Sequence, residues 1–473
     1  MRILSRRSYA ATLALLTAAG AMAGCSRKDP AAREAREHLR ASLDDAAPRA
    51  ATSRAAREIE KDVRQFYERA DYWPAWFDGT RPKAGWDDLL RTFERVQKQG
   101  LDPEAYDLDD LRARRGQAQK TGLLRRESFT PTEVAAIDVE LTRAFLRCAS
   151  HLSRGELTPD AVHEEWTGRP RALDRVAALE EALRSGDIEE ALVKLAPTHP
   201  GYTRLVTALE TAPPERRRQI ELNLDRWRWL PADLGTRFIV VNIPSYELRL
   251  FEDGRQTMQM RVVVGKKFDP TPVFSDEMTY VTFNPAWNVP ATILTDEILP
   301  ALKDDRDYLA KHDMELVKDN EVVDRDDVDL DDPKSFTLRQ RPGTANPLGQ
   351  VKFVFPNQFD VYLHDTPADA LFARAERAFS HGCVRLEKPL DLAAQLLRDQ
   401  PRWDRAAIEK AIAGGEEQSV TLAKPLPVHI VYWTAWVEND GSLHFADDVY
   451  GHDQAQTVAL DRARTRLERH ASN

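Results

Sequence analysis

Apolar side chains recur at helical spacing through the first half of the chain, from about residue 54 to about residue 230. Two amphipathic faces are formed by Ile59, Val63, Phe66 and Tyr67 and by Leu89, Leu90, Phe93 and Val96. Gly100 is typical of a helix C-terminus, and Thr130 with Glu133 is typical of a helix start. We therefore predict an all-α domain over 54–230, with helices at about 131–152, 158–166, 171–185, 188–195 and 201–211.

From residue 236 the pattern changes to strands. Residues 238–243 are rich in β-branched side chains, 246–251 alternate, and a turn at 252–254 leads into 258–264. Further strands are predicted at 279–283, 351–355 and 361–363, which gives a mostly-β domain over 236–425. An insertion at about 290–340 contains a helical segment and an acidic loop, and long insertions of this kind are usually functional.

The last part of the chain, 426–473, is predicted to be a C-terminal strand and helix extension. Residues 428–437 favour a strand, and about 454–470 favour a charged, peripheral helix. Together these patterns predict the α+β class: an N-terminal all-α domain, then a mostly-β domain that carries a helical and loop insertion.

The N-terminus favours export. Arg6 and Arg7 precede an apolar stretch that is too short to span a bilayer, so 1–24 is typical of a signal peptide. The run Met-Ala-Gly-Cys at 22–25 resembles a bacterial lipobox, which predicts lipidation of Cys25. Ordinary cleavage near Ala23 and twin-arginine export are the alternatives. Residues 25–53, which have few large apolar side chains, are predicted to be a flexible tether, and the protein is expected in the periplasm or cell envelope, with the outer membrane possible.

The charge of the chain argues against nucleic acid as a partner. Lys and Arg total 67 against 77 Asp and Glu, a formal net charge of −10. There are 3 cysteines, Cys25, Cys148 and Cys383. Cys148 lies in a helical apolar pattern that is typical of a small buried side chain. One Cys and two His do not make a closed zinc site, so we expect no metal and no cofactor.

Cys383 has a different setting. It lies in the run Ser-His-Gly-Cys-Val-Arg at 380–385, with His364 upstream. A cysteine reacts as thiolate, and a nearby imidazole can take its proton. Gly382 removes a side chain next to the sulfur, so that the backbone can approach a carbonyl group. The pattern predicts an acyl-transfer site, and a buried structural cysteine is the alternative.

The spacing of His364 from the run at 380–385 resembles the signature of the L,D-transpeptidases, the family with a YkuD-type catalytic domain. The resemblance extends to 341–349, 361–367, 283–290 and 225–231, and 66–103 is similar to the scaffold of the long members. The long members often carry a peptidoglycan-binding module after the scaffold, and residues 201–225 leave no room for one. The resemblance also implies that the insertion is a capping subdomain.

The resemblance implies a site chemistry. Cys383 is the expected nucleophile and His364 the general base, oriented by the backbone near Asp365, with His381 near the oxyanion or in proton transfer and the amides around Gly382 forming the oxyanion hole. Substrate contacts are expected from Arg385, Trp287, Asn288, Asn346 and Tyr362. The expected partners are donor and acceptor stem peptides of peptidoglycan, together with the membrane through the lipid anchor.

Three functions remain open at this point. The first is an L,D-transpeptidase that releases D-alanine from tetrapeptide stems through a cysteine thioester and can be acylated by carbapenems. The second is a hydrolytic relative, either an L,D-carboxypeptidase or an enzyme that attaches or detaches proteins on peptidoglycan. The third is a wall-binding scaffold without activity, which the intact His364 and Cys383 pair disfavours.

Overall fold

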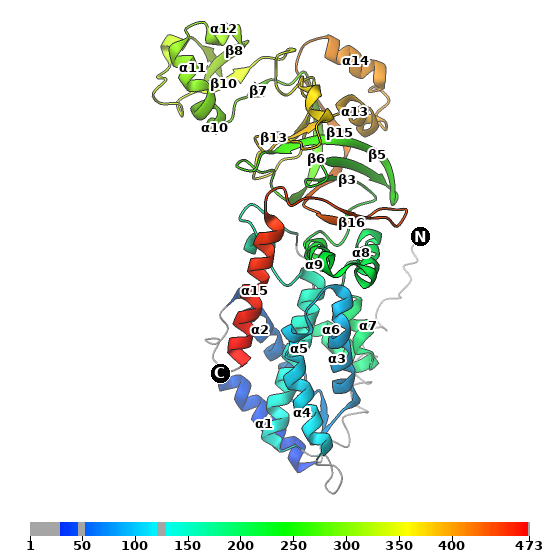
Figure 1. Ribbon diagram of the computed structural model, residues 1–473. Coiled ribbons are helices and arrows are strands. Elements are labelled where there is room, and N and C mark those ends of the chain that lie inside the picture. The colour runs from blue at the N-terminus through cyan, green and yellow to red at the C-terminus, as the bar shows by residue number, and fades with distance from the viewer. Residues whose placement is uncertain (1–28, 46–52, 121–128, 170, 472–473) are drawn as a thin grey trace, which may run out of the picture.

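The computed structural model describes residues 29–45, 53–120, 129–169 and 171–471. A helical scaffold is followed by a β-rich domain, and a smaller subdomain projects from that domain at the end remote from the scaffold (Figure 1). The predicted α+β class, with helices first and sheet second, is confirmed. Within the described ranges no helix is long and apolar enough to cross a membrane.

The scaffold is built around α5 (Pro131–Arg154), which the other helices surround (Figure 1). Thr130 and Glu133 form a capping box at its start, where a helix start was predicted. Gly100 ends a 3₁₀ turn, Val96–Gln99, with φ +72°. The region predicted as a helix at 158–166 contains only the 3₁₀ turn Pro159–Ala161. The other scaffold helices are α2 (Arg54–Arg69), α3 (Ala84–Arg95), α4 (Leu108–Lys120), α6 (Arg175–Ser185), α7 (Ile188–Val193), α8 (Pro200–Thr211) and α9 (Pro214–Arg228), with a short hairpin of β1 (Phe77–Asp78) and β2 (Arg81–Pro82).

Helix α1 (Pro30–Asp45) corrects the prediction of a flexible tether over 25–53. It packs on α5, and its buried face consists of Ala32, Ala35, Leu39 and Leu43. Alanines supply half of this face, so the contact is invisible to a search for large apolar side chains. Arg36 also forms an ion pair of 2.6 Å with Asp71. The tether prediction is therefore wrong for α1.

The β-rich domain is a sheet that closes on itself. Its strands are ordered β13-β5-β14-β12-β11-β6-β15-β3-β4, and β4 also pairs with β5. The core inside this closed sheet contains apolar side chains from nearly every strand. The strands are β3 (Arg237–Asn242), β4 (Glu247–Glu252), β5 (Arg255–Gly265), β6 (Phe274–Phe283), β11 (Val351–Val354), β12 (Leu363–His364), β13 (Ala378–Ser380), β14 (Val384–Leu386) and β15 (Gln418–Val431), and the helices α13 (Pro389–Leu397) and α14 (Arg405–Ala413) pack outside.

Strand β3 joins the two domains because both of its faces are buried. Ile239 and Val241 belong to the core inside the closed sheet. Phe238 and Val240 point the other way and belong to the core of the helical scaffold. The scaffold and the β-rich domain therefore share a continuous apolar interface.

Strand β15 corrects the prediction of a separate C-terminal extension over 426–473. It pairs antiparallel with β6 and parallel with β3, so it lies inside the sheet and crosses the predicted boundary at residue 425. A local pattern predicts a strand but not its neighbours, which are decided by pairing across the fold. After β15 the chain forms a hairpin of β16 (Ala435–Val437) and β17 (Leu443–Phe445).

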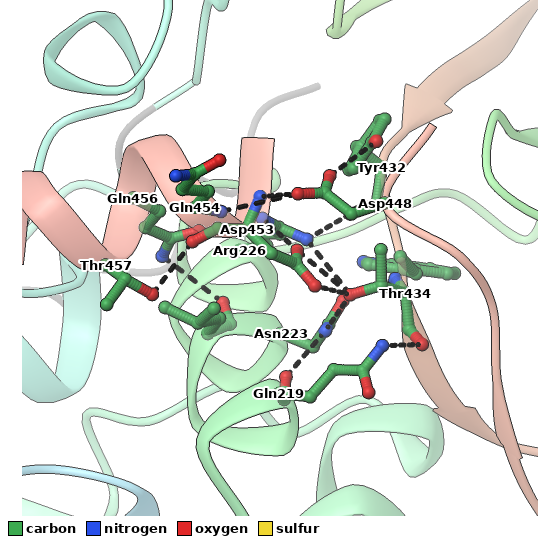
Figure 2. A network of polar contacts seen from close by, with 12 residues as sticks. Gln219, Asn223, Arg226, Tyr432, Thr434, Asp448, Asp453, Gln454, Gln456 and Thr457 are labelled. Carbon is green, nitrogen blue, oxygen red and sulfur yellow. Dashed lines mark hydrogen bonds and ion pairs between the residues drawn. The ribbon is translucent and has the colours of Figure 1, made fainter. Parts of the chain in front are cut away.

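Helix α15 (His452–Ala471) runs back along the scaffold (Figure 1), and its side chains His452, Gln456 and Leu460 are buried. At its start, a polar network joins it to α9 and to the end of β15, as Figure 2 shows. Arg226 of α9 forms an ion pair of 2.7 Å with Asp453 and donates to the backbone oxygen of Tyr432. Asp453 in turn accepts a hydrogen bond of 2.8 Å from Thr434.

The insertion at 290–340 is a small domain rather than a helix and an acidic loop. Its sheet has the order β7-β10-β8-β9, and its core includes Leu302, Leu316 and Leu338. Its elements are β7 (Trp287–Asn288), α10 (Ala291–Ile293), the π-helix η7 (Leu294–Ile298), α11 (Leu299–Asp304), α12 (Tyr308–Lys311), β8 (Met314–Lys318), β9 (Glu321–Val323) and β10 (Thr337–Gln340). We call it the insertion subdomain.

Candidate active site

Cys383 lies on the tight turn between β13 and β14. Ser380 fixes this turn, because its hydroxyl donates to the backbone oxygen of Cys383 at 2.5 Å and accepts from the amide of Gly382 at 3.2 Å. Thr271 holds the carbonyl of Gly382 at 2.7 Å. Gly382 has φ +107°, a conformation that favours glycine. The sequence therefore needs glycine here for the backbone to turn and present the half-buried thiol.

His364 reaches the same face of the sheet through strand pairing. Strands β12 and β14 are parallel, and His364 pairs with Arg385. On the other side β11 pairs with β12, and Lys352 lies opposite His364. Directly paired residues share a face, so Lys352, His364 and Arg385 form a row across three strands. Tyr362 and Cys383 lie two positions earlier in the chain, just before β12 and β14. Lys352 lies over the Tyr362 ring, and the charges of Lys352 and Arg385 act on Cys383.

The backbone fixes the tautomer of His364. Its Nδ1 lies 2.5 Å from the carbonyl oxygen of Asp365, which can only accept, so Nδ1 carries the proton and Nε2 is free to act as a base. The carboxylate of Asp365 accepts from the amides of Gln350 and Thr366, and this holds the carbonyl in place. The predicted orientation of the imidazole by backbone near Asp365 matches this geometry.

His364 is neutral in this setting. Burial lowers its pKa to about 3, and the positive charges of Arg385 and Lys352 act in the same direction. A neutral imidazole with a free Nε2 can accept a proton at any pH above this value.

The thiol of Cys383 is also in its neutral form before reaction. Burial raises its pKa, while hydrogen bonds from Tyr362 and the charges of Lys352 and Arg385 oppose that effect. The thiol donates weakly to the backbone oxygen of Asp360 at 4.0 Å. The pair is therefore a neutral thiol and a neutral imidazole, with two cations placed to stabilise the thiolate as it forms.

One of the predicted substrate residues, Tyr362, lies next to the sulfur. Its hydroxyl interacts with Cys383 and with the side chain of Trp287, a second predicted substrate residue. Burial and the adjacent sulfur raise the pKa of Tyr362, so it stays protonated and donates. Trp287 belongs to β7, the first strand of the insertion subdomain, and so links that subdomain to the thiol.

Arg385 has a donor without a protein partner. Its Nε is buried and makes no hydrogen bond among the described residues. Its charge raises the cost of protonating His364 and favours the Cys383 thiolate. A buried guanidinium donor without a partner favours an anionic group such as a carboxylate.

His381 lies on the exposed side of the turn that carries Cys383, and its Nε2 contacts Glu297 of η7 at 2.8 Å. This contact joins the turn to the insertion subdomain. The expected role of His381 near the oxyanion or in proton transfer stays a prediction.

Asn346 and Asn288 are not brought to the sulfur. Asn346 is buried, its amide nitrogen donates to the carbonyls of Pro285 and Arg341, and its oxygen accepts from the amide of Leu348. Its polar atoms are thus used within the protein, and the expectation of a substrate contact is wrong. Asn288 is exposed on β7 and pairs with Arg339 of β10.

The other two cysteines for which a role was predicted are Cys148 and Cys25. Cys148 is buried in α5 without a disulfide, and burial raises its pKa, so it is a packing residue. Cys25 and the predicted signal peptide lie outside the described residues, so the lipid anchor stays a prediction. Among the described residues no group of three or more His, Cys, Asp or Glu side chains is arranged to hold a metal ion.

Lys352 was missed by the sequence analysis. It lies in a strand whose neighbours Val351 and Phe353 are buried, and an isolated lysine in such a strand reads as a solvent-facing position. The sequence signal for Lys352 is its alternation with Val351 and Phe353, which places its side chain on the face of β11 opposite to theirs. Only the pairing of β11 with β12 shows that this face is also that of His364.

Comparison with known proteins divides the chain into the same two domains, a scaffold and a β-rich domain. The model of a scaffold domain matches residues 61–209, and that of the L,D-transpeptidase catalytic domain matches residues 236–412. A curated Haemophilus influenzae protein, assigned to the L,D-transpeptidases by its name, is 36% identical over 246 residues, which cover 51% of this chain and 49% of that protein. The chain thus spans about half the length of this relative.

Two solved structures are also similar in part. An L,D-transpeptidase from Mycobacterium smegmatis is 16% identical, with 41% of this chain and 58% of the other covered and a TM-score of 0.21. An L,D-transpeptidase in complex with imipenem is 14% identical, with 41% and 59% covered and a TM-score of 0.20. Residues 236–412 thus match the L,D-transpeptidase catalytic domain that the motif at 380–385 predicted, and a match to a scaffold domain precedes them.

Proposed function

We propose that this protein is an L,D-transpeptidase that cross-links peptidoglycan stem peptides through a thioester on Cys383. The observation that carries the proposal is the setting of the thiol. His364, with a free Nε2, pairs with Arg385, two residues after Cys383, and the charges of Lys352 and Arg385 act on the thiol. A scaffold without activity would have no need of this arrangement.

The first half-reaction forms the acyl-enzyme. The sulfur of Cys383 attacks the carbonyl carbon of the bond before the terminal D-alanine, and His364 Nε2 takes the thiol proton. Lys352 and Arg385 stabilise the negative charge on sulfur. The C–N bond then breaks, the proton passes to the leaving amine, and D-alanine departs, leaving the thioester.

Stabilisation of the oxyanion is assigned to the turn at Cys383. The amide of Gly382 already donates to Ser380, so the amide of Cys383 and the Tyr362 hydroxyl, which contacts the sulfur, are the groups nearest to the developing charge. Arg385 is proposed to bind a carboxylate of the donor stem through its free Nε.

The second half-reaction releases the product. The side-chain amine of a diamino acid on another stem attacks the thioester, the C–S bond breaks, and His364 carries the amine proton back to sulfur. Water in place of the amine would give the L,D-carboxypeptidase reaction, because nucleophile and base are the same. The acceptor therefore decides between the two activities.

Intact-protein mass spectrometry with a tetrapeptide donor tests the acyl-enzyme. We expect an adduct with the mass of the tripeptide acyl group, equimolar release of D-alanine, and loss of both in Cys383→Ala. Cys148→Ala is the matched control, since Cys148 is buried in the scaffold and should leave the adduct intact. An adduct that persists in Cys383→Ala would refute the assignment, and a carbapenem adduct should map to the same residue.

Product analysis with and without an acceptor stem separates transfer from hydrolysis. Cross-linked dimers that appear only with acceptor support the transpeptidase, whereas tripeptide alone in both reactions supports the carboxypeptidase. We also propose that the protein acts in the cell envelope, anchored by lipid on Cys25. Cys25→Ser should then release it from the membrane fraction of expressing cells.

A further inference from the structure

A cavity lies between the scaffold and the β-rich domain, and none of the site residues described above lines it. Its volume is about 460 Å³, within the range of ~300–1,000 Å³ typical of small-molecule sites. Its walls come from the start of α8, the end of α9, strands β3 and β4, and the segment around β16. These elements belong to both domains, so the cavity exists only when the two domains are packed together.

Stacked aromatic rings form one wall of this interdomain cavity. The rings of Trp227 and Trp433 lie 4.3 Å apart at 19°, and the ring of His199 stacks on Trp227 at 4.9 Å and 23°. Phe238 and Phe251 stack at 5.0 Å on the neighbouring strands. Aromatic walls of this kind bind the apolar face of a ligand ring.

The unpartnered polar atoms of the cavity are donors. Trp227 is only 4% exposed, and its Nε1 makes no hydrogen bond among the described residues. The Nε atoms of Arg171 and Arg204 are likewise buried without a partner there. His199 accepts from the Gly201 amide through Nδ1, and burial lowers its pKa to about 4, so the neutral ring carries its proton on Nε2. These buried donors without partners favour a ligand that offers hydrogen-bond acceptors.

The charges of the wall limit the net charge of that ligand. Arg249 contacts both Glu247 and Glu438 at 2.7 Å, so this cluster has one net negative charge, and Asp233 on the wall adds a second. Arg204 donates to the amide oxygen of Asn439, a neutral partner, at 3.0 Å. The guanidinium groups of Arg204 and Arg171 balance these two negative charges, which favours a ligand with little net charge and many carbonyl and hydroxyl oxygens.

We infer that this interdomain cavity binds a saccharide: an N-acetylated amino-sugar disaccharide unit of the glycan strand whose stems the enzyme joins. Sugar rings offer an apolar face for Trp433 and a rim of hydroxyl and acetyl oxygens for Trp227, Arg171 and Arg204. The inference rests on the proposed function, and it gives this chain a glycan contact without a separate wall-binding module.

Binding of a stem-free disaccharide tests the inference. Full-length Cys383→Ala protein is titrated with N-acetylglucosaminyl-N-acetylmuramic acid by calorimetry. Loss of one charge-assisted hydrogen bond in Arg204→Gln should weaken binding about 10-fold. Arg216→Gln is the matched control, because Arg216 is exposed on α9 and does not line the cavity. Arg171→Gln serves as a second variant if Arg204→Gln does not fold.

Each outcome of these titrations either supports or overturns the inference. Binding that weakens in Arg204→Gln or Arg171→Gln but not in Arg216→Gln supports it. Absence of binding to the parent protein, or equal binding by all folded variants, overturns it. Acyl transfer on a sugar-free tetrapeptide, measured with Cys383 intact, should not change in Arg204→Gln. A failure of that reaction in the unmodified enzyme would count against the proposed function alone.

Discussion

The ammonium nitrogen of Lys352 lies 3.8 Å from the centroid of the Tyr362 ring, and the hydroxyl of that ring contacts the thiol of Cys383. A partly buried cation is thus held over an aromatic face beside the Cys383 thiol. Burial lowers the pKa of Lys352, and the sulfur of Cys383 opposes this most strongly. The two groups therefore favour each other's charged forms.

Removing this charge should make the thiol harder to ionise. Lys352→Met is expected to shift the pH dependence of Cys383 alkylation by iodoacetamide upward by about one unit, because an adjacent opposite charge is lost. Lys352→Arg keeps the charge and should alkylate close to the unmodified protein. Equal profiles for the Met and Arg variants would show that the charge has no role. Cys148 is buried and gives no background in the folded protein.

The contact between His381 and Glu297 should hold the insertion subdomain against the active-site turn. Glu297→Gln is expected to raise hydrogen exchange in η7 and α11 and to increase KM more than it lowers kcat. Asp296→Asn, one position away on the same π-helix, is the control. If the two variants exchange alike, the contact does not position the subdomain.

The network in Figure 2 should stabilise the attachment of α15 to α9. Arg226 is 4% exposed and lies over the rings of Trp166 and Tyr432 at 5.5 and 5.2 Å. Arg226→Leu leaves Asp453 without its cation, and we expect a loss of about 3–5 kcal/mol in the free energy of unfolding. Adding Asp453→Leu should recover part of that loss in urea denaturation. A further loss in the double variant would contradict the ion-pair explanation.

Acid should destabilise the fold through buried histidines. Burial lowers the pKa from 6.5 to about 3 or about 4 in His151, His364, His452, His199 and His429. Between these values and 6.5 the unfolded chain binds protons that the folded chain does not, so stability falls as pH drops through that window. Asp138, with its pKa raised by burial to about 6, acts in the opposite direction, and so do other carboxyl groups whose pKa burial raises, among them Glu140, Glu156, Asp225 and Asp365.

Thermal unfolding at pH 7.5, 5.5 and 4.5 measures this effect. We expect the Tm to fall steadily across the series. His364→Gln removes one of these groups and should reduce the slope of Tm against pH. A Tm that stays constant from pH 7.5 to 4.5 would mean that the histidines are accessible to protons in the folded protein.

The sequence predicted the chemistry at the turn because that chemistry is local. The residue types at 380–385, the glycine conformation at Gly382 and the capping box at Thr130 depend on neighbours along the chain, which a single sequence displays. The scaffold helices and the alternating strands followed from periodicity for the same reason. The tether prediction failed at α1, where small side chains of Ala32 and Ala35 pack against a partner that lies far away in the sequence.

The sequence by itself thus predicted the candidate nucleophile, its candidate base and the order of the two domains. The tertiary structure decided what surrounds them. Pairing of β11, β12 and β14 placed Lys352 and Arg385 beside His364, and insertion of β15 between β3 and β6 made the end of the chain part of the sheet. The interdomain cavity arises only from packing of α8 and α9 on β3 and β4. Strand register and domain contacts depend on burial and hydrogen bonding between residues that are far apart in the sequence. A local sequence pattern therefore does not predict them.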